Sequence, residues 1–270
     1  MSIHHSSIIH PDAKLGADVK IGPFCTVGAD VVLGDRVELV SNVVIDGKTK
    51  IGDDSIIYPF AVLGVMAQDL KHKDPDSMTG LKIGKRCRIR EFATIHSGTP
   101  ASTGTEVGND CQIMVSSHIG HDCKLGNSIV LSNLAQLAGH VEVEDNVIIS
   151  GFSAVHQFCR IGRNAFVAPM SGVGFDVPPY TIFEGKPATY RTINKVGLLR
   201  HGFTNEDLHA VHKVYAAVFA KDQAGNFASN LKKVRKEVHG NKYALDALDF
   251  IENRSKRGAH KGLLEREDEA

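Results

Sequence analysis

Residues 107–131 read VGNDCQIMVSSHIGHDCKLGNSIVL, and this stretch decides the fold. Every sixth position, from Val107 to Leu131, holds Val, Ile or Leu, and a glycine often follows it directly. This spacing matches neither the ~3.6-residue period of an α-helix nor the ~2-residue period of a simple β-strand. Hexapeptide repeats are typical of a parallel β-helix. The stretch therefore predicts short strands, three to a triangular coil of about eighteen residues, with an aliphatic side chain in each inward corner.

The same repeat covers most of the first two-thirds of the chain. Its further positions are Ile9, Leu15, Ile21, Val27, Leu33, Leu39, Ile45, Ile51, Ile57, Leu63, Ile83, Ile89, Ile95, Leu137, Val143, Ile149, Val155, Ile161, Val167 and Val173. The repeat is interrupted at residues 65–80 and 98–105, both of them largely polar. We expect loops that leave the coil wall there, and such loops often carry function on a rigid solenoid. Surface insertions without a function are the alternative. The predicted β-helix domain spans residues 1–189.

The chain after Pro187 has a helical pattern. Thr204 is suited to cap a helix, because acidic residues follow it in the first turn. Apolar residues then recur at spacings of three and four in three groups. These are Leu208, Val211, Tyr215, Val218 and Phe219, then Leu231, Val234 and Val238, then Tyr243, Leu245, Leu248 and Ile251. The pattern predicts a small α-helical C-terminal domain over residues 190–270.

The composition argues against several classes of function. The 270 residues carry a formal net charge of zero, which disfavours bulk binding of nucleic acid. No apolar run approaches the roughly 18 residues of a membrane-spanning helix. Residues 1–11 lack the basic and apolar parts of a signal peptide. We therefore expect no nucleic-acid partner, no transmembrane segment and a cytoplasmic location.

The five cysteines fit the interior of the coils. Each stands four residues after an aliphatic position of the repeat, in a slot that small residues such as Ala61 and Ala93 fill elsewhere. They are Cys25, Cys87, Cys111, Cys123 and Cys159. We expect them to be packing residues in a reducing compartment rather than reactive thiols.

Four histidines of the repeat region form a pattern. His140 follows His121 by nineteen residues and His156 follows His140 by sixteen. Because one coil takes about eighteen residues, we expect these three on one wall, with His118 near the same edge. Three explanations are open: a zinc site, as in the β-helical carbonic anhydrases, a general base, or hydrogen-bonded histidines at a subunit interface.

The neighbours of His121 favour the general base. Asp122 directly follows it, and its carboxylate can orient the imidazole if the turn brings it back onto the ring. Gly139 comes eighteen residues after His121, so a backbone N–H without a side chain beside it can face the reacting centre as an oxyanion donor. A base and such an N–H on adjacent coils suit acyl transfer.

Several motifs together resemble those of the UDP-N-acetylglucosamine O-acyltransferases, a family of the hexapeptide-repeat acyltransferases. They are His118-Ile-Gly-His121-Asp-Cys, Leu137-Ala-Gly139-His140-Val, Ala154-Val-His156-Gln157-Phe-Cys, Asp176-Val-Pro-Pro-Tyr, Gln68-Asp69-Leu-Lys71 and Ile89-Arg-Glu … Thr94-Ile-His96. The resemblance covers nearly the whole chain. It implies an all-β left-handed parallel β-helix with a helical C-terminal domain, assembled as a homotrimer with active sites between subunits. It also implies transfer of an (R)-3-hydroxyacyl chain from acyl carrier protein to the 3-hydroxyl of UDP-N-acetylglucosamine in lipid A synthesis, without a metal or another cofactor.

The resemblance also implies roles for particular residues. His121 would be the general base, Asp122 its orienting partner and Gly139 the oxyanion donor. The residues implied to contact the nucleotide sugar, the acyl chain or the carrier arm are Gln68, Asp69, Lys71, His118, His140, His156, Gln157, Asn194 and Arg200. Basic residues of the C-terminal helices would bind the acidic carrier protein, although a solvated helix face is the alternative. They are Lys232, Lys233, Arg235, Lys236, Arg254, Lys256 and Arg257.

Some positions depart from the family pattern. Val196 stands where the family often has Glu, and His201 where it often has Arg, which weakens the expected nucleotide contacts. Pro169, followed by Met170, stands at a position that sets acyl-chain length in the family and is often Gly there. A bulkier residue predicts a shorter preferred acyl chain. Relatives that acylate a 3-amino analogue of the UDP-sugar are the alternative for the acceptor.

Overall fold

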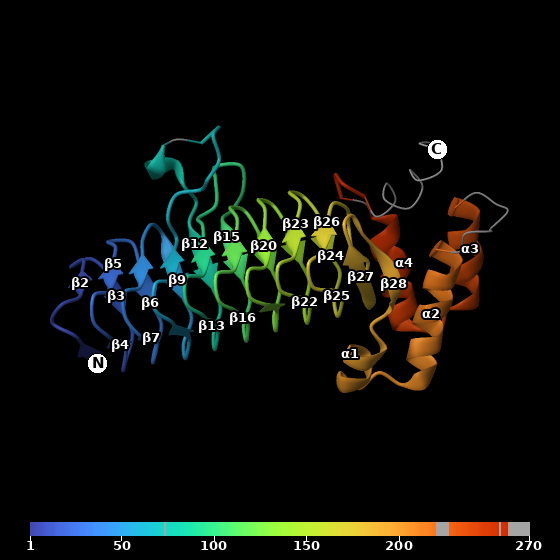
Figure 1. Ribbon diagram of the computed structural model, residues 1–270, viewed down its shortest axis with the longest axis horizontal. Coiled ribbons are helices and arrows are strands. Elements are labelled where there is room, and N and C mark those ends of the chain that lie inside the picture. The colour runs from blue at the N-terminus through green and yellow to red at the C-terminus, as the bar shows by residue number, and fades with distance from the viewer. Residues whose placement is uncertain (73, 220–226, 254, 259–270) are drawn as a thin grey trace.

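The computed structural model describes residues 1–72, 74–219, 227–253 and 255–258. In these, the repeat region forms a solenoid of short parallel strands, and Figure 1 shows its coils from the N-terminal end to the helical domain. Strands on the same side of successive coils pair in register, as Ile113 does with Leu131. The aliphatic positions of the repeat therefore stack on one another along the interior of the solenoid.

Three sheets form the walls. Sheet A contains β1 (Ser2–Ile3), β4 (Lys20–Ile21), β7 (Glu38–Leu39), β10 (Ile56–Ile57), β13 (Arg88–Ile89), β16 (Gln112–Ile113), β19 (Val130–Leu131), β22 (Ile148–Ile149), β25 (Phe166–Val167), β27 (Thr181–Gly185) and β28 (Ala188–Ile193). Sheet B contains β2 (Ile8–Ile9), β5 (Thr26–Val27), β8 (Val44–Ile45), β11 (Val62–Leu63), β14 (Thr94–Ile95), β17 (His118–Ile119), β20 (Gln136–Leu137), β23 (Ala154–Val155) and β26 (Gly172–Val173). Sheet C contains β3 (Lys14–Leu15), β6 (Val32–Leu33), β9 (Thr49–Ile51), β12 (Leu81–Ile83), β15 (Thr105–Val107), β18 (Lys124–Leu125), β21 (Glu142–Val143) and β24 (Arg160–Ile161).

The interior of the solenoid is filled by the repeat aliphatics. From Ile21 to Val173 these side chains are at most 4% exposed, whereas Ile9 and Leu15 in the first coil are only partly buried. All five cysteines are buried in the same core, so the prediction that they are packing residues is confirmed. Truncation of such a core side chain typically costs about 2–5 kcal/mol of stability. The solenoid is thus a rigid support for its turns.

Two excursions leave the solenoid on the edge between sheets B and C. The first spans residues 65–80 and contains the short 3₁₀ helix η1 (Pro75–Ser77), and the second spans residues 98–105. An antiparallel bridge between Gly80 and Gly98 joins their bases. The backbone N–H of Ser97 also donates to the carbonyl of Val65. Figure 1 shows both excursions rising together from one side of the coils.

The C-terminal part begins with a hairpin rather than with a helix. Strands β27 and β28 pair antiparallel and extend sheet A beyond its last full coil. The predicted domain boundary at residue 190 falls inside β28, because hairpin strands lack the six-residue repeat that marks the coils. Four helices follow in the described residues of this part: α1 (Lys195–Arg200), α2 (Asn205–Phe219), α3 (Phe227–Glu237) and α4 (Lys242–Glu252).

The helices pack into a second core of their own. Thr204 caps α2 as predicted, since its hydroxyl accepts a hydrogen bond from the Asp207 N–H and donates one to the Asp207 carboxylate. The helical core joins the solenoid through Tyr215, whose hydroxyl donates to the Pro179 carbonyl. Within the described ranges, none of the helices has the length and apolarity needed to cross a bilayer.

Candidate active site

The turns that follow the strands of sheet B carry a row of histidines. We call this row the histidine edge. It comprises His96 after β14, His121 after β17, His140 after β20 and His156 after β23. Both excursions leave from this same edge. The sequence spacing therefore correctly predicts that His121, His140 and His156 lie on one side of successive coils.

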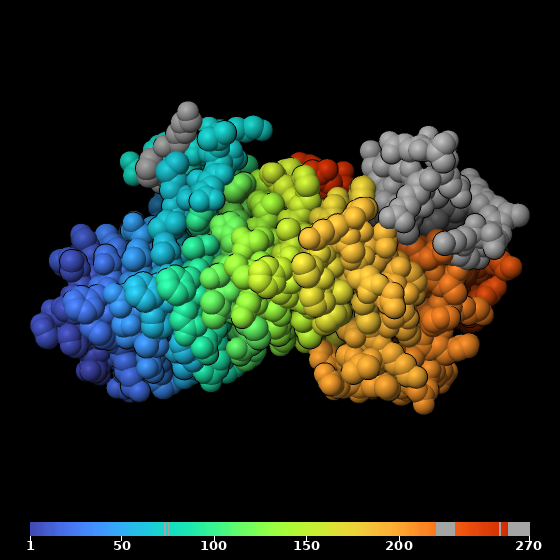
Figure 2. Space-filling model, in the orientation of Figure 1, coloured from blue at the N-terminus to red at the C-terminus, as the bar shows by residue number. Residues whose placement is uncertain are grey.

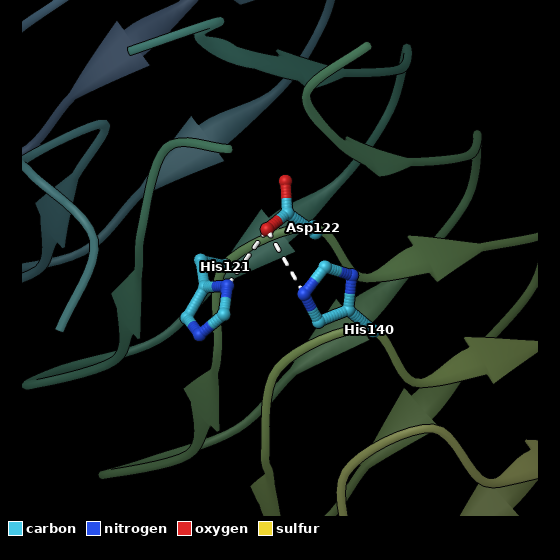
Figure 3. A group of neighbouring side chains, drawn as sticks. All are labelled: His121, Asp122 and His140. Atoms are coloured by element: carbon cyan, nitrogen blue, oxygen red, sulfur yellow. Dashed lines mark hydrogen bonds and ion pairs between the residues drawn. The ribbon is translucent and has the colours of Figure 1, made fainter. Parts of the chain in front are cut away.

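His121 and Asp122 form a buried pair on this edge. The Nδ1 atom of His121 lies 2.7 Å from Oδ2 of Asp122, and the Asp122 side chain has no exposed surface. Asp122 has a φ of 62°, which is the turn conformation that directs its carboxylate back toward the preceding imidazole. Figure 3 shows the carboxylate between the rings of His121 and His140.

Asp122 is also held by the second excursion. Its oxygens accept hydrogen bonds from the backbone N–H and the hydroxyl of Thr99, both at 2.8 Å, and from the hydroxyl of Ser102. Burial acts to raise the pKa of Asp122. The hydrogen bonds from His121, Ser102 and Thr99 outweigh burial and hold the pKa well below its usual range. Asp122 is therefore ionised, and because a carboxylate only accepts hydrogen bonds, Nδ1 of His121 must donate.

Gly139 lies against the other side of the His121 ring. A Cβ atom on Gly139 would stand 2.5 Å from both Nε2 and Cε1 of His121, which is closer than van der Waals contact allows. The absence of a side chain is thus required at this position. Within the described part of the chain, the Gly139 N–H has no hydrogen-bond acceptor. The position one coil after His121 therefore presents an N–H group with no side chain beside it.

His140 extends the pair into a triad of side chains. Its Nε2 lies 3.4 Å from Oδ2 of Asp122, and its ring meets the His121 ring edge-on at 5.1 Å between centroids. The ring of Phe158 stacks on the far face of His140 at 4.7 Å. Burial lowers the pKa of His140, and the charge of Asp122 opposes this only in part. His140 is therefore a neutral hydrogen-bonding group near neutral pH.

His118 lies on β17, the strand that leads into His121, and His96 follows β14 one coil earlier. Nδ1 of His118 is 2.7 Å from the Thr94 hydroxyl, and its ring meets that of His96 edge-on at 4.9 Å. Burial, followed by the nearby His121, lowers the pKa of His118. Burial, followed by His118 and His121, lowers the pKa of His96 to about 4. Nδ1 of His96 is buried without a hydrogen-bond partner in the described structure.

The first excursion brings acidic and basic side chains toward the histidine edge. Asp69 is half-buried, its Oδ1 accepts from the Lys71 N–H at 2.9 Å, and its charge lies within electrostatic range of His121 and His140. The hydrogen bond from the Lys71 N–H lowers the pKa of Asp69. Gln68 and Lys71 are exposed. This excursion thus adds a carboxylate near the buried pair, with an exposed lysine two residues after it.

Other predicted site residues lie away from this edge in a single chain. Asn194 caps α1, accepting from the Gly197 N–H, and Arg200 is exposed at the end of that helix. Figure 1 shows α1 on the opposite side of the molecule from the two excursions. Pro169 and Met170 lie in the turn between sheets A and B, on a different corner of the coil, and both are exposed. One chain does not bring these residues together with His121.

Three groups of the site could also be metal ligands. His121, Asp122 and His140 offer ligand atoms that all lie within 4.8 Å of one another. Zinc requires its ligands to converge on one point about 2.0–2.2 Å from each. Oδ2 of Asp122 is instead the common acceptor for His121 Nδ1 and the Thr99 hydroxyl. This arrangement fits a hydrogen-bonded cluster better than a zinc site.

The chemistry that fits is proton abstraction beside an oxyanion donor. Since Nδ1 of His121 carries the proton bonded to Asp122, its Nε2 holds a free lone pair, and this nitrogen lies against Gly139. Thr99 and Ser102 were not predicted as site residues from the sequence. In the sequence they are distinguished only by lying in a polar interruption of the repeat. Because the repeat does not continue through this segment, the spacing could not predict that they contact Asp122.

Comparisons with known proteins agree with this architecture. Residues 12–47 match the family model "Bacterial transferase hexapeptide (six repeats)", and residues 176–260 match "Udp N-acetylglucosamine O-acyltransferase; Domain 2". The acyl-[acyl-carrier-protein]–UDP-N-acetylglucosamine O-acyltransferase of Sinorhizobium fredii is 44% identical over 94% of this chain and 93% of its own length. That of Thermodesulfovibrio yellowstonii is 43% identical over 95% and 98%.

Solved structures match over the same length. The UDP-N-acetylglucosamine acyltransferase of Bacteroides fragilis superposes with a TM-score of 0.90 at 37% identity, over 95% of this chain and 98% of its own. That of Francisella novicida has a TM-score of 0.88 at 39% identity, over 95% and 92%. The predicted left-handed parallel β-helix with a small helical C-terminal domain is therefore confirmed.

Proposed function

The chain belongs to the UDP-N-acetylglucosamine O-acyltransferase family, and we propose that it transfers an acyl chain from acyl carrier protein to UDP-N-acetylglucosamine in lipid A synthesis. The observation that carries the proposed mechanism is the buried His121–Asp122 pair with Gly139 directly beside it. The geometry supplies a base and an oxyanion donor, and a thioester donor is reactive enough for these two groups to suffice.

The reaction follows from the tautomer of His121. Its Nε2 removes the proton of the sugar 3-hydroxyl, and the hydroxyl oxygen then attacks the thioester carbonyl. The Gly139 N–H stabilises the negative charge that develops on the carbonyl oxygen. Collapse of this intermediate breaks the carbon–sulfur bond, and the carrier thiolate takes the proton back from His121. Asp122 holds the ring in place and stabilises the imidazolium between these steps, as in a serine-hydrolase triad.

The other residues bind the substrates in this proposal. Asp69 and Lys71, with Gln68, contact the sugar and phosphate, while His118, His140, His156 and Gln157 line the cleft for the nucleotide sugar and the acyl chain. Asn194 and Arg200 contact the nucleotide or the carrier arm from a neighbouring subunit. Val196 and His201 weaken these contacts relative to other members of the family. His201 is itself engaged, since its Nδ1 lies 2.5 Å from the Asn164 Oδ1.

A homotrimer accounts for the separation of these residues in one chain. The histidine edge and the Asn194–Arg200 segment lie on opposite sides of the molecule, and in this proposal a second subunit completes the cleft. An exposed apolar row follows the corner between sheets A and B, where a symmetric assembly would cover it. This row consists of Phe24, Phe60, Phe92, Leu134, Phe152 and Met170. In the proposed assembly, Met170 and Pro169 of one subunit lie near the acyl chain bound at the next.

The acidic carrier protein docks on basic residues of the terminal helices. Lys232, Lys233 and Lys236 of α3 are exposed, whereas Arg235 pairs with Asp249 and Glu252. Arg254, which the sequence analysis assigned to this group, lies outside the described residues. Long-range steering by such a cluster raises the association rate and weakens with salt.

The test is acyl transfer from (R)-3-hydroxyacyl carrier proteins of ten, twelve and fourteen carbons, with UDP-N-acetylglucosamine or its 3-amino analogue as acceptor. We expect ester formation, a preference for the shorter chains because of Pro169 and Met170, and no loss of rate after chelation of metals. Inactivity with both acceptors would overturn the proposed function. A higher rate with the 3-amino analogue would favour the alternative acceptor. A clear preference for the fourteen-carbon donor would refute the role of Pro169 and Met170 in chain length. Zinc-dependent hydration of CO₂ would favour a carbonic anhydrase.

A further inference from the structure

Residues Ser255–Gly258, which we call the C-terminal strap, leave α4 and return to the solenoid. Their anchor is Asp176, a residue of the last coil that is 1% exposed. The Ser255 hydroxyl donates to its Oδ1 at 2.6 Å, the Ser255 N–H donates to its Oδ2 at 3.2 Å, and the Asp176 N–H donates to the Gly258 carbonyl. Arg160 shares this carboxylate through its guanidinium at 3.1 Å.

This anchor fixes the strap on the histidine edge. Asp176 lies in the same row of turns as His121, His140 and His156, one coil beyond His156. In Figure 2 the red end of the described chain lies directly against the last coils of the solenoid. The C-terminal strap therefore brings two cations, Lys256 and Arg257, to an edge that they are far from in sequence.

Arg257 contacts two groups of the candidate site. One terminal nitrogen of its guanidinium lies 2.7 Å from Nδ1 and 3.1 Å from Nε2 of His156, and its Nε donates to the Gln157 carbonyl at 3.1 Å. A guanidinium has donors only, so the imidazole nitrogen that it meets must be an acceptor. The shorter contact is to Nδ1, so this nitrogen is the acceptor and the ring proton lies on Nε2. Without Arg257, Nδ1 can instead donate to the Gln157 carbonyl, from which it lies 3.2 Å. Arg257 thus restrains an otherwise exposed ring.

Lys256 continues the contact toward the buried triad. Its ammonium lies 4.5 Å above the centre of the Phe158 ring, whose other neighbour is the stacked imidazole of His140. The charge of Lys256 also reaches His140. The strap therefore supports the outer two members of the histidine edge through two separate contacts.

We infer that Arg257 is a positioning residue for acyl transfer, which holds the His156 imidazole and the Gln157 carbonyl in the arrangement that binds the substrate. This inference rests on the proposed function, because it assigns a role to residues that line that cleft. Fixing the ring before the substrate arrives removes the entropic cost of ordering it on binding. The C-terminal segment is in this view part of the active site as well as of the helical domain.

A double-mutant cycle separates this role from a structural one. We expect Arg257→Ala to lower kcat/KM about tenfold, in line with a lost hydrogen bond to a charged group. Arg257→Lys, which keeps the charge but loses the forked geometry, retains part of the activity. In a His156→Ala background, Arg257→Ala has less than about a twofold effect, since the ring that it orients is gone. Arg191→Ala, which removes the exposed pair with Glu184 on the hairpin, is the matched control and leaves kcat/KM unchanged.

Nitrogen-15 NMR of the His156 ring provides a readout that does not depend on activity. We expect one neutral tautomer in the wild type and a mixture of tautomers in Arg257→Ala, with the thermal midpoint unchanged. An equal loss of activity from Arg257→Ala with and without His156, or the same tautomer mixture in both proteins, would overturn the inference. A wild type that is inactive with both acceptors would overturn the proposed function instead, and the tautomer measurement would still decide the role of Arg257.

Discussion

Asp122 is the residue on which the geometry of the site most depends. It joins His121 to the second excursion, because its two oxygens are shared between the imidazole and the Thr99–Ser102 segment. Its pKa is held low by these hydrogen bonds against the effect of burial, so the carboxylate stays charged throughout the neutral range. The proton on Nδ1 of His121 is fixed as a consequence, and Nε2 remains available as the base.

His96 makes the free energy of unfolding depend on pH. In the unfolded chain a histidine titrates near 6.5, whereas burial and the neighbouring histidines lower the pKa of His96 to about 4. Between these values the unfolded chain binds a proton that the folded protein does not. The free energy of unfolding therefore falls as the pH decreases through this window, by up to about 1.4 kcal/mol per pH unit. We expect His96→Gln to flatten this slope in urea unfolding measured from pH 4 to 7.

The exposed His209 on α2 provides the control for this experiment. His209→Gln should leave the slope as it is in the wild type, because an exposed ring is solvated equally in both states. His118 and His140 also have lowered pKa values, so part of the slope remains in His96→Gln. A slope that is identical in the wild type and His96→Gln would show that His96 is protonated equally in the folded and unfolded chains.

At the scale of the single coil, the features that repeat with each turn could be predicted from the sequence. Spacing alone predicts the strands, the inward aliphatics, the buried cysteines and the neighbourhood of His121 and Gly139, since each follows from a fixed number of residues per turn. The Thr99–Asp122 hydrogen bonds, α1, the β27–β28 hairpin and the C-terminal strap do not follow from it. Their positions depend on loop geometry and tertiary packing, which carry no period in the sequence.

Gly139 lies so close to the His121 ring on the neighbouring coil that a substitution there tests the position of the base. Gly139→Ala would place a Cβ atom 2.5 Å from the His121 ring, whereas a Cβ atom on Gly174 would meet nothing within 4 Å. We expect Gly139→Ala to lower kcat/KM about a hundredfold, because displacement of a catalytic group by about 1 Å costs a factor of this size. Gly174→Ala should be close to the wild type in rate and thermal midpoint. Near-normal activity of Gly139→Ala would contradict the placement of the base.

At the scale of the whole molecule, one chain does not bring together all the residues that we propose for the site. The solenoid presents the histidine edge on one corner and the exposed apolar row on another, while α1 carries Asn194 and Arg200 on a third side. A trimer in which the apolar row of one subunit faces the histidine edge of the next would bring all three together. The exposed apolar row supports this assembly.

Phe152 tests the assembly directly. It is 65% exposed in the single chain and lies between Leu134 and Met170 in the exposed apolar row. We expect Phe152→Asp to convert trimers into monomers in analytical ultracentrifugation and to abolish activity, because a charge would be buried without a partner at the interface. Phe152→Tyr keeps the ring and should remain trimeric. A Phe152→Asp protein that sediments as a trimer would place the subunit contact elsewhere.

The central claim is that His121 is the base of an acyl transfer to a nucleotide sugar. Its most direct test is the rate of ester formation from hydroxyacyl carrier protein and UDP-N-acetylglucosamine, for the wild type and His121→Ala. We expect a loss of about a hundredfold to ten-thousandfold in kcat for His121→Ala, with the oligomeric state and the thermal midpoint of the wild type. A His121→Ala enzyme that keeps most of the wild-type rate would contradict it.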